Sequence, residues 1–254
     1  MKTEGNTLQS LDRALELLDI LANKRLPQSA ADLSNELHIN RTTVYAMLNS
    51  LLKKQYIEKD ETTSRYTIGY KLFELGQMYR YKFPFYNLAE KQAVILKDKW
   101  KLNVYVSVYK ECGSALMLLV QLPSGTPMLS AGWSTPLHAT GMGKVLLSGF
   151  TDEQLEEELQ GMTFTSYTSS TITDPAVLRA VIQDVKKQGY AFDNCEYLDN
   201  TFCIASPLRD IAGHVVAAMS ISGPKELVAE NREDILRDIQ AATRLISMDL
   251  GWRP

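Results

Sequence analysis

The stretch from residue 136 to residue 147 is the clearest candidate for phosphate chemistry. Its sequence, PLHATGMGKVLL, places a lysine directly after the glycine pair Gly141 and Gly143. In a P-loop, backbone N–H groups and a lysine hold the phosphates, and a Ser or Thr after the lysine binds Mg²⁺. Here Val145 follows the lysine, and His138 stands where the first glycine of that motif belongs. The motif is therefore incomplete at both ends.

Nucleophilic catalysis has little support in the residue pattern. GWSTP at residues 132–136 lacks the second glycine of a GxSxG elbow. Cys203 lies inside an apolar segment, and we interpret it as a core residue. The histidines are far apart in the sequence, and we interpret each as structural: His38, His138 and His214. We predict no enzyme, cofactor or metal, but distant residues can converge, so an enzyme acting on a small ligand stays an alternative.

Ligand binding suits the glycine stretch better. Gly141 and Gly143 let a ligand approach the backbone, and free N–H groups at a helix start favour a carboxylate or phosphate. The glycines can equally serve only to pack a helix on a sheet. Four polar residues at or near expected strand ends would complete an apolar pocket: Asp193, Cys203, Ser220 and Ser222. The candidate aromatic walls, which can also be plain core, are Trp133, Tyr105 and Tyr109.

Residues 40–55, NRTTVYAMLNSLLKKQ, are suited to contact with a polyanion. Their apolar residues have the spacing of an amphipathic helix: Val44, Met47, Leu48, Leu51 and Leu52. Asn40 is the expected N-cap, and no acidic residue occurs between Glu36 and Glu58. We predict contacts with the grooves of DNA from Thr42, Thr43, Tyr45 and Asn49. We predict phosphate contacts from Arg41 and Lys53.

The flanking segments indicate a DNA-binding unit. Ser29 and Asp32 form a capping box at the start of a helix over residues 29–37, and three residues connect it to the helix from 40 to 55. Beyond it, segments 56–59 and 65–68 alternate as the strands of a hairpin. A helix-turn-helix followed by a hairpin is a winged helix, whose second helix enters the major groove. Arg65 is the predicted phosphate contact of the hairpin. Ser29 and Asn40 complete the predicted DNA-contacting set, unless the winged helix serves only as a protein-interaction scaffold.

Composition limits the other possibilities. The 254 residues carry a net charge of -3, and 45% of them are apolar. The first 80 residues carry 11 basic and 10 acidic side chains, so any nucleic-acid face must be local. The three cysteines have no CxxC spacing, and no apolar run approaches the ~18 residues of a membrane span. We therefore expect a cytoplasmic protein with no membrane contact.

The pattern predicts an α+β protein in three parts. Residues 7–69 form the winged helix and begin with a helix over 8–23, whose expected buried stripe is Leu8, Leu11, Leu15 and Leu18. Residues 70–84 form a linker helix that ends at Phe83-Pro84-Phe85. This helix is either a dimer contact or a simple spacer. Residues 85–254 form an antiparallel sheet flanked by helices. Expected strands there are 104–109, 115–121, 128–132, 191–192, 202–208 and 215–221. Expected helices are 85–101, 140–148, 151–159, 174–188 and a closing helix with apolar residues from Ile235 to Ile246.

Three stretches together resemble the IclR family of transcriptional regulators. The first is LSNELHINRTTVYAMLNSLLKKQYI at 33–57, and the second is PLHATGMGKVL at 136–146. The third is GYAFDNCEYLDNTFCIASPLRDIAGHVVAAMSISGP at 189–224. The resemblance covers nearly the whole chain. It implies a winged helix, a linker helix and a GAF-like effector-binding domain, in a homodimer or dimer of dimers on a double-stranded DNA operator.

The resemblance also implies an effector pocket for a small organic acid or aromatic catabolite. The implied pocket residues are the backbone around Gly141 and Met142, with Asp193, Cys203, Ser220 and Ser222. Met142 replaces a usual alanine, Asn194-Cys195 replaces a frequent acid, and Asn200 stands where a glycine is frequent. We accordingly predict a ligand-responsive regulator, a repressor in the first instance, whose effector carries a carboxylate.

Overall fold

The computed structural model describes residues 7–24, 26–123 and 129–253. The chain divides into two compact units, residues 1–82 and 83–254, which we call the reader unit and the effector domain. The boundary lies at the proline interruption Phe83-Pro84-Phe85. None of the helices in the described ranges is long and apolar enough to cross a membrane.

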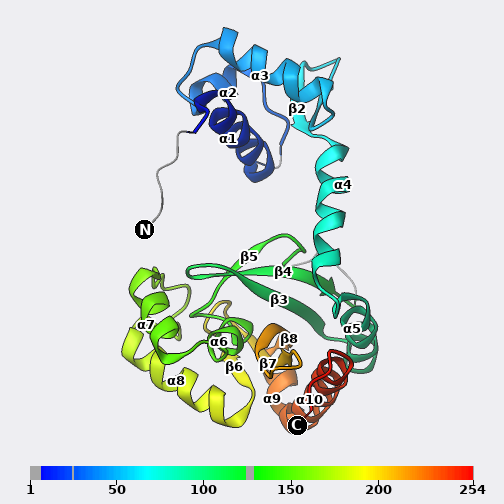
Figure 1. Ribbon diagram of the computed structural model, residues 1–254, viewed down its shortest axis with the longest axis vertical. Coiled ribbons are helices and arrows are strands. Elements are labelled where there is room, and N and C mark those ends of the chain that lie inside the picture. Colours follow the sequence, from blue (N-terminus) through cyan, green and yellow to red (C-terminus); the bar gives the residue numbers. More distant parts are fainter. Residues whose placement is uncertain (1–6, 25, 124–128, 254) are drawn as a thin grey trace. The chain divides into compact units, whose positions relative to one another are not determined.

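The reader unit is a helix-turn-helix followed by a two-stranded hairpin, as predicted (Figure 1). Its elements are α1 (Gln9–Lys24), α2 (Ala30–Glu36), α3 (Arg41–Lys53), β1 (Ile57–Asp60), β2 (Arg65–Ile68), α4 (Tyr70–Tyr79) and the 3-10 turn η1 (Arg80–Lys82). β1 and β2 pair antiparallel, with Ile57 opposite Ile68 and Asp60 opposite Arg65. An isolated bridge from Gln28 to Tyr66 attaches the hairpin to the segment before α2.

The core of the reader unit confirms the stripe predicted for α3 but not the one predicted for α1. Val44, Met47 and Leu48 of α3 are buried. On α1, the buried residues are Leu17 and Leu21, whereas three of the predicted residues are exposed: Leu8, Leu11 and Leu15. Helix α1 carries two leucine rows with the same helical spacing. Periodicity alone therefore could not show which row packs against the core.

Helix α4 has no buried residue. Its side chains Phe73 and Met78, and Tyr81 in the following turn, are 69%, 58% and 70% exposed. Leu75 and Tyr79 are exposed as well. Exposed apolar surface of this extent is unusual for a helix and is typical of a protein–protein contact.

The effector domain is a six-stranded antiparallel sheet in the order β5-β4-β3-β8-β7-β6. The strands are β3 (Asn103–Glu111), β4 (Ser114–Gln121), β5 (Ser134–Pro136), β6 (Ala191–Asn194), β7 (Thr201–Arg209) and β8 (Val215–Pro224). The helices are α5 (Tyr86–Trp100), α6 (Gly141–Leu147), α7 (Asp152–Gly161), α8 (Pro175–Gln188), α9 (Lys225–Glu230) and α10 (Arg232–Asp249).

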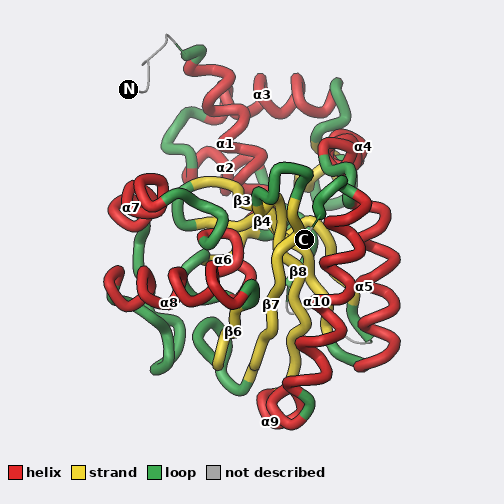
Figure 2. The backbone as a smooth tube through the Cα atoms, turned by 60° about the horizontal axis from the view of Figure 1, so that its bottom comes forward, coloured by secondary structure: helices red, strands yellow, loops and turns green. Residues whose placement is uncertain are grey.

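Helices cover both faces of this sheet. One apolar core contains residues of α5, α9 and α10, and the other contains residues of α6, α7 and α8. Figures 1 and 2 show these two groups on opposite sides of the strands. The predicted α+β architecture is therefore confirmed.

The helix starts in this domain follow local capping. Thr140 accepts the N–H of Gly143, Thr151 accepts that of Gln154, and Asp174 accepts that of Ala176. The strand predicted over 128–132 is wrong in its described part. Residue 128 lies outside the described residues, and 129–132 contain no strand. Ala131 and Gly132 form a turn, with Gly132 at a positive φ of 90°, and the strand begins at Ser134. The short helix α9 was not predicted.

Candidate effector site and nucleic-acid interface

Strand register brings the predicted polar residues together on one face of the sheet. Asp193 of β6 is the partner of Cys203 of β7, and Cys203 is the partner of Ser222 of β8. Register partners in an antiparallel sheet point to the same face. Ser220 lies two residues from Ser222 on β8, so it shares that face as well, and its partner on β3 is Tyr105. Residues far apart in sequence thus form one polar patch.

Helix α6 begins directly above this patch. A methyl group on Gly141 would lie 3.3 Å from Cβ of Ala205 and 3.5 Å from the backbone nitrogen of Asp193. The absence of a side chain at Gly141 therefore lets the helix start approach the sheet closely. Thr140 Oγ1 accepts the N–H of Gly143 at 3.1 Å. The N–H groups of Gly141 and Met142, which have no partner within a helix, remain available at this end.

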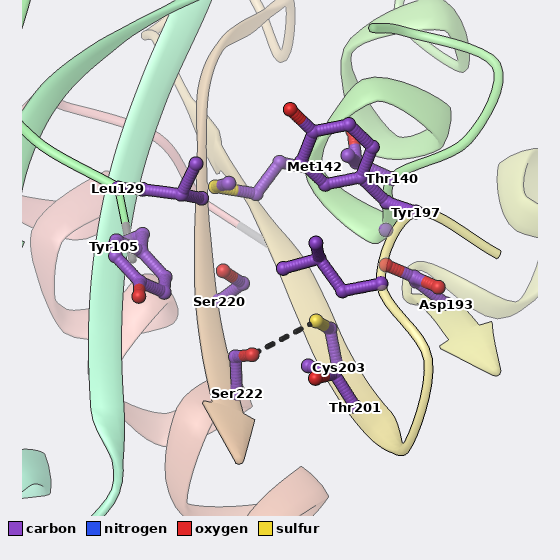
Figure 3. A pocket seen from close by; sticks show the side chains of 12 residues that line it. Tyr105, Leu129, Thr140, Met142, Asp193, Tyr197, Thr201, Cys203, Ser220 and Ser222 are labelled. Carbon is purple, nitrogen blue, oxygen red and sulfur yellow. Dashed lines mark hydrogen bonds between the residues drawn. The ribbon is translucent and has the colours of Figure 1, made fainter. Parts of the chain in front are cut away.

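Together these residues line a single small cavity (Figure 3). Its volume is about 30 Å³, which corresponds to room for about two water molecules. All six predicted pocket residues line it: Gly141, Met142, Asp193, Cys203, Ser220 and Ser222. Tyr105, a candidate wall, lines it too. The remaining lining residues were not predicted from the sequence: Leu129, Thr140, Tyr197, Leu198 and Thr201.

Two of the predicted aromatic walls lie elsewhere. Trp133 does not line the cavity, and its carbonyl accepts the backbone N–H of Met117 next to β5. The Tyr109 hydroxyl donates to Glu158 at 2.8 Å, and its ring contacts Phe150. Tyr105 and Tyr197 supply the aromatic surface instead. Tyr197 lies in the β6–β7 loop, a position that strand periodicity cannot predict.

The cavity has a largely apolar surface with a few polar groups, and none of its lining residues has a cationic side chain. Burial raises the pKa of Asp193 to about 6, against the opposing effect of the Glu196 N–H that this carboxylate accepts at 2.7 Å. Burial also raises the pKa of the Cys203 thiol well above its usual value, and the thiol donates to the Ser222 hydroxyl at 3.1 Å. The Ser220 hydroxyl is buried and has no hydrogen-bond partner within the described residues.

A buried ion pair holds the loop that lines the cavity. Lys144, on α6, donates to Glu196 and, at 2.9 Å, to the carbonyl of Phe192. Both charged side chains are almost fully buried, at 2% and 10% exposure. Because Glu196 follows β6 and also donates its N–H to Asp193, this pair fixes the loop that carries Tyr197. The sequence pattern shows Lys144 only as part of an incomplete P-loop, and it gives no signal for Glu196.

The loop before α8 packs over the same region. Thr168 and Thr171 donate their hydroxyls to the carbonyls of Cys195 and Glu196, both at 2.6 Å. His138 is buried, and its Nε2 lies 3.0 Å from the carbonyl of Thr165. Burial lowers the pKa of His138, so a neutral ring is favoured there. In the described ranges, no three His, Cys, Asp or Glu side chains gather closely enough to hold a metal ion.

The outward face of α3 carries the predicted groove-contacting residues in an exposed row. Thr42, Tyr45 and Asn49 are exposed, and so are Arg41 and Lys53 at the two ends of the helix. Tyr45, at 49% exposure, is a large aromatic side chain that the core does not use. The arrangement leaves this polar, acid-free face open to a partner.

Four other predicted DNA contacts already have intramolecular partners. Asn40 Oδ1 accepts both the N–H and the hydroxyl of Thr43, at 2.8 and 2.9 Å. Ser29 accepts the N–H of Asp32 within the predicted capping box. Arg65 Nη1 donates to the carbonyl of Pro27 at 3.0 Å and lies 3.5 Å from Asp32. Capping and hairpin attachment thus account for these four residues without DNA.

The comparisons with known proteins match this architecture in both units. The family model for the C-terminal part of the bacterial transcriptional regulator IclR matches residues 87–248, and the IclR helix-turn-helix model matches residues 10–61. The chain belongs to the IclR family. It is thus a DNA-binding transcriptional regulator with an effector-binding domain, and not an enzyme.

Similar full-length proteins support the same assignment. The HTH-type transcriptional repressor AllR of Salmonella paratyphi A is 28% identical to this family member, with 97% of this chain and 91% of AllR covered. The IclR structure from Thermotoga maritima has a TM-score of 0.77 at 25% identity and covers 97% of this chain and 100% of that one. An IclR homologue from Microbacterium hydrocarbonoxydans, complexed with 4-hydroxybenzoate, has a TM-score of 0.81 at 22% identity, covering 95% and 99%.

Proposed function

We propose that this IclR-family regulator represses transcription. We also propose that a small carboxylic acid in the Asp193 cavity makes it release its DNA or changes its position on the DNA. The observation that carries the proposal is the row of Asp193, Cys203 and Ser222 beneath the start of α6. AllR is a repressor, and the Microbacterium homologue was solved with an aromatic acid, which supports both halves of the proposal. We place the protein in the cytoplasm because its DNA target is there.

The chemistry of the cavity favours a carboxylate held by neutral donors. The N–H groups of Gly141 and Met142 and the unpartnered Ser220 hydroxyl can donate to the ligand's oxygens. Asp193 would repel an anion when ionised. Because its pKa is already about 6, this carboxyl group takes up a proton at modest cost and then donates a hydrogen bond. A cavity of about 30 Å³ requires Met142, Tyr197 or Leu198 to move when the ligand enters.

Ligand binding is tested by thermal denaturation of the full chain with pyruvate, succinate, benzoate and 4-hydroxybenzoate. A binding acid at 100 times its Kd should stabilise the effector domain by about 2.7 kcal/mol. The Ser222→Ala and Asp193→Asn variants should lose that stabilisation. Ser170→Ala, which changes an exposed serine outside the cavity, should keep it. Equal stabilisation of the wild-type protein and all three variants would mean that the acid binds outside the Asp193 cavity.

We propose that the reader unit binds double-stranded DNA with α3 in the major groove. The exposed row of Thr42, Tyr45 and Asn49 would contact bases, and Arg41 and Lys53 would contact phosphates. Ser29, Asn40, Thr43 and Arg65 would act mainly by holding α2, α3 and the hairpin in place. We further propose a homodimer, because α4 exposes Phe73 and Met78 and a two-fold dimer matches a palindromic operator.

Arg41→Ala should weaken DNA binding and lower the slope of log Kd against log salt by about 1, because one phosphate contact is lost. The measurement is fluorescence anisotropy on DNA fragments that the wild-type protein selects from a random library, over a range of salt concentrations. Lys71→Ala is the matched control, because Lys71 lies on α4 and pairs with Glu74 at 2.8 Å. An unchanged slope for Arg41→Ala would remove Arg41 from the phosphate contacts.

A further inference from the structure

A second cavity lies on the opposite face of the effector-domain sheet from the Asp193 cavity. It has a volume of about 300 Å³ and is bounded by the end of β7, helix α10 and the segment after that helix. Ser206, Arg209, Gln240, Arg244 and Trp252 contribute to its walls. Neither effector binding in the Asp193 cavity nor DNA binding by α3 uses this space, which we call the Arg209 cleft.

The two arginines of the cleft lack the carboxylate partner that Arg179 and Arg237 of this domain have. Neither Arg209 nor Arg244 forms an ion pair with any acidic side chain in the described residues. Arg209 is half-buried, and one of its guanidinium nitrogens donates to the carbonyl of Gly213 at 2.8 Å. Arg237 on the same helix as Arg244, in contrast, pairs with Asp234 at 2.7 Å.

Burial of Arg209 is not compensated by a nearby negative charge. Burial lowers the pKa of this guanidinium, and no acidic group contributes an opposing effect. Removing a cation from water without a partner is unfavourable. No acidic residue occurs among the residues that line the cleft. An anion between the two guanidinium groups would supply the missing charge.

The floor of the cleft is held in place by hydrogen bonds between β7 and α10. The hydroxyls of Ser206 and Thr243 lie 2.9 Å apart, and both residues are buried. Ser247 accepts the backbone N–H of Arg209 at 2.9 Å. These contacts fix the backbone from which Arg209 projects, so the site is preorganised.

We propose that the Arg209 cleft binds a small oxyanion, a phosphate or a carboxylate, between the guanidinium groups of Arg209 and Arg244. A guanidinium group matches these oxyanions because its N–H donors form a planar fork. The Gln240 amide adds a neutral donor at the same wall. The Asp193 cavity differs, since no cationic side chain lines it. The chain would then recognise two ligands, one through neutral donors and one through paired arginines.

The test is isothermal titration of the full chain with inorganic phosphate and, separately, with succinate, at constant ionic strength maintained with sodium chloride. We expect at least one of the two anions to bind in the Arg209 cleft. Arg244→Gln should weaken this binding at least tenfold, because the anion loses one charge-assisted hydrogen bond. Phosphate alone would indicate a phosphorylated ligand, and succinate alone a carboxylate. Either result supports the proposal when Arg244→Gln weakens the binding.

Two control variants show whether the anion binds in the cleft. Arg237→Gln removes the same charge from α10 outside the cleft and should leave the affinity within about twofold. Ser222→Ala changes the Asp193 cavity, so anion binding that this variant loses belongs to that cavity, whereas binding in the Arg209 cleft should persist. Arg244 is exposed, so its replacement does not disturb the core. Absence of binding by both anions up to roughly 50 mM, or equal binding by Arg244→Gln and Arg237→Gln, would overturn the proposal.

Self-association through the cleft is the remaining alternative, and sedimentation distinguishes it. The proposal expects wild-type protein and Arg244→Gln to have the same oligomeric state with and without phosphate. If Arg244→Gln forms a smaller oligomer than the wild-type protein, and neither anion binds, the cleft is a contact between copies of the chain. The oxyanion site is then excluded.

Discussion

Replacing Lys144 with alanine should destabilise the effector domain by about 3–5 kcal/mol, because the charge of Glu196 would then be buried without its partner. The two side chains are only 2% and 10% exposed, so water cannot take over the lysine's role. The change would also release the carbonyl of Phe192, which Lys144 holds at 2.9 Å. Glu196 would then no longer fix the loop that bears Tyr197.

Urea denaturation followed by tryptophan fluorescence measures this loss. Trp100, Trp133 and Trp252 all lie beyond residue 82, so the signal reports the effector domain within the full chain. Lys186→Ala is the control, because its ion-pair partner Asp152 is 77% exposed and ion pairs open to water contribute under about 1 kcal/mol. Lys144→Met combined with Glu196→Leu should recover much of the loss. A cost for Lys144→Ala as small as that for Lys186→Ala would refute a structural role for the pair.

Replacing Gly143 with alanine should cost about 3 kcal/mol, although alanine is the better helix former by about 1 kcal/mol. A methyl group at this position would overlap the backbone carbonyl and Cα of Leu137. The backbone of Leu137 cannot move aside easily, because its own N–H bonds the carbonyl of Gly113 at 3.0 Å. The strain would therefore displace α6 from the sheet.

Gly141→Ala is the matched control in the same helix. There the nearest atom to the added methyl group is Cβ of Ala205 at 3.3 Å, which small shifts can relieve. The same fluorescence measurement should show a clearly smaller loss of stability for Gly141→Ala than for Gly143→Ala. Equal losses would mean that helix propensity or cavity packing, rather than the approach to Leu137, decides the effect.

Local signals explain what the sequence predicts well. Thr140, Thr151 and Asp174 act on N–H groups two or three residues away, so cap chemistry alone places the starts of α6, α7 and α8. The hairpin and the stripe of α3 likewise follow from short-range periodicity. The polar set at Asp193, Cys203, Ser220 and Ser222 was identified from strand ends and from the IclR resemblance, and the sheet register brings it together.

Features set by distant contacts could not be predicted in this way. The buried row of α1 depends on which side meets the reader-unit core, and its two leucine rows are equivalent in periodicity. The partner of Lys144 is 52 residues away, and no spacing rule connects them. Trp133 precedes a strand of only three residues. An error of a few positions in placing that strand is therefore enough to assign Trp133 wrongly to the cavity wall. Tyr197 and Leu198 enter the cavity from a loop without regular alternation.

The most direct test of effector control is the affinity of the full chain for its selected DNA with and without the acid that raises its thermal stability. Fluorescence anisotropy should show at least a fivefold change in Kd for wild-type protein, as expected for a coupling free energy of about 1 kcal/mol or more. Ser222→Ala should bind the same DNA without responding to the acid. A stabilising acid that leaves the DNA affinity of the wild-type protein unchanged would contradict effector control through the Asp193 cavity.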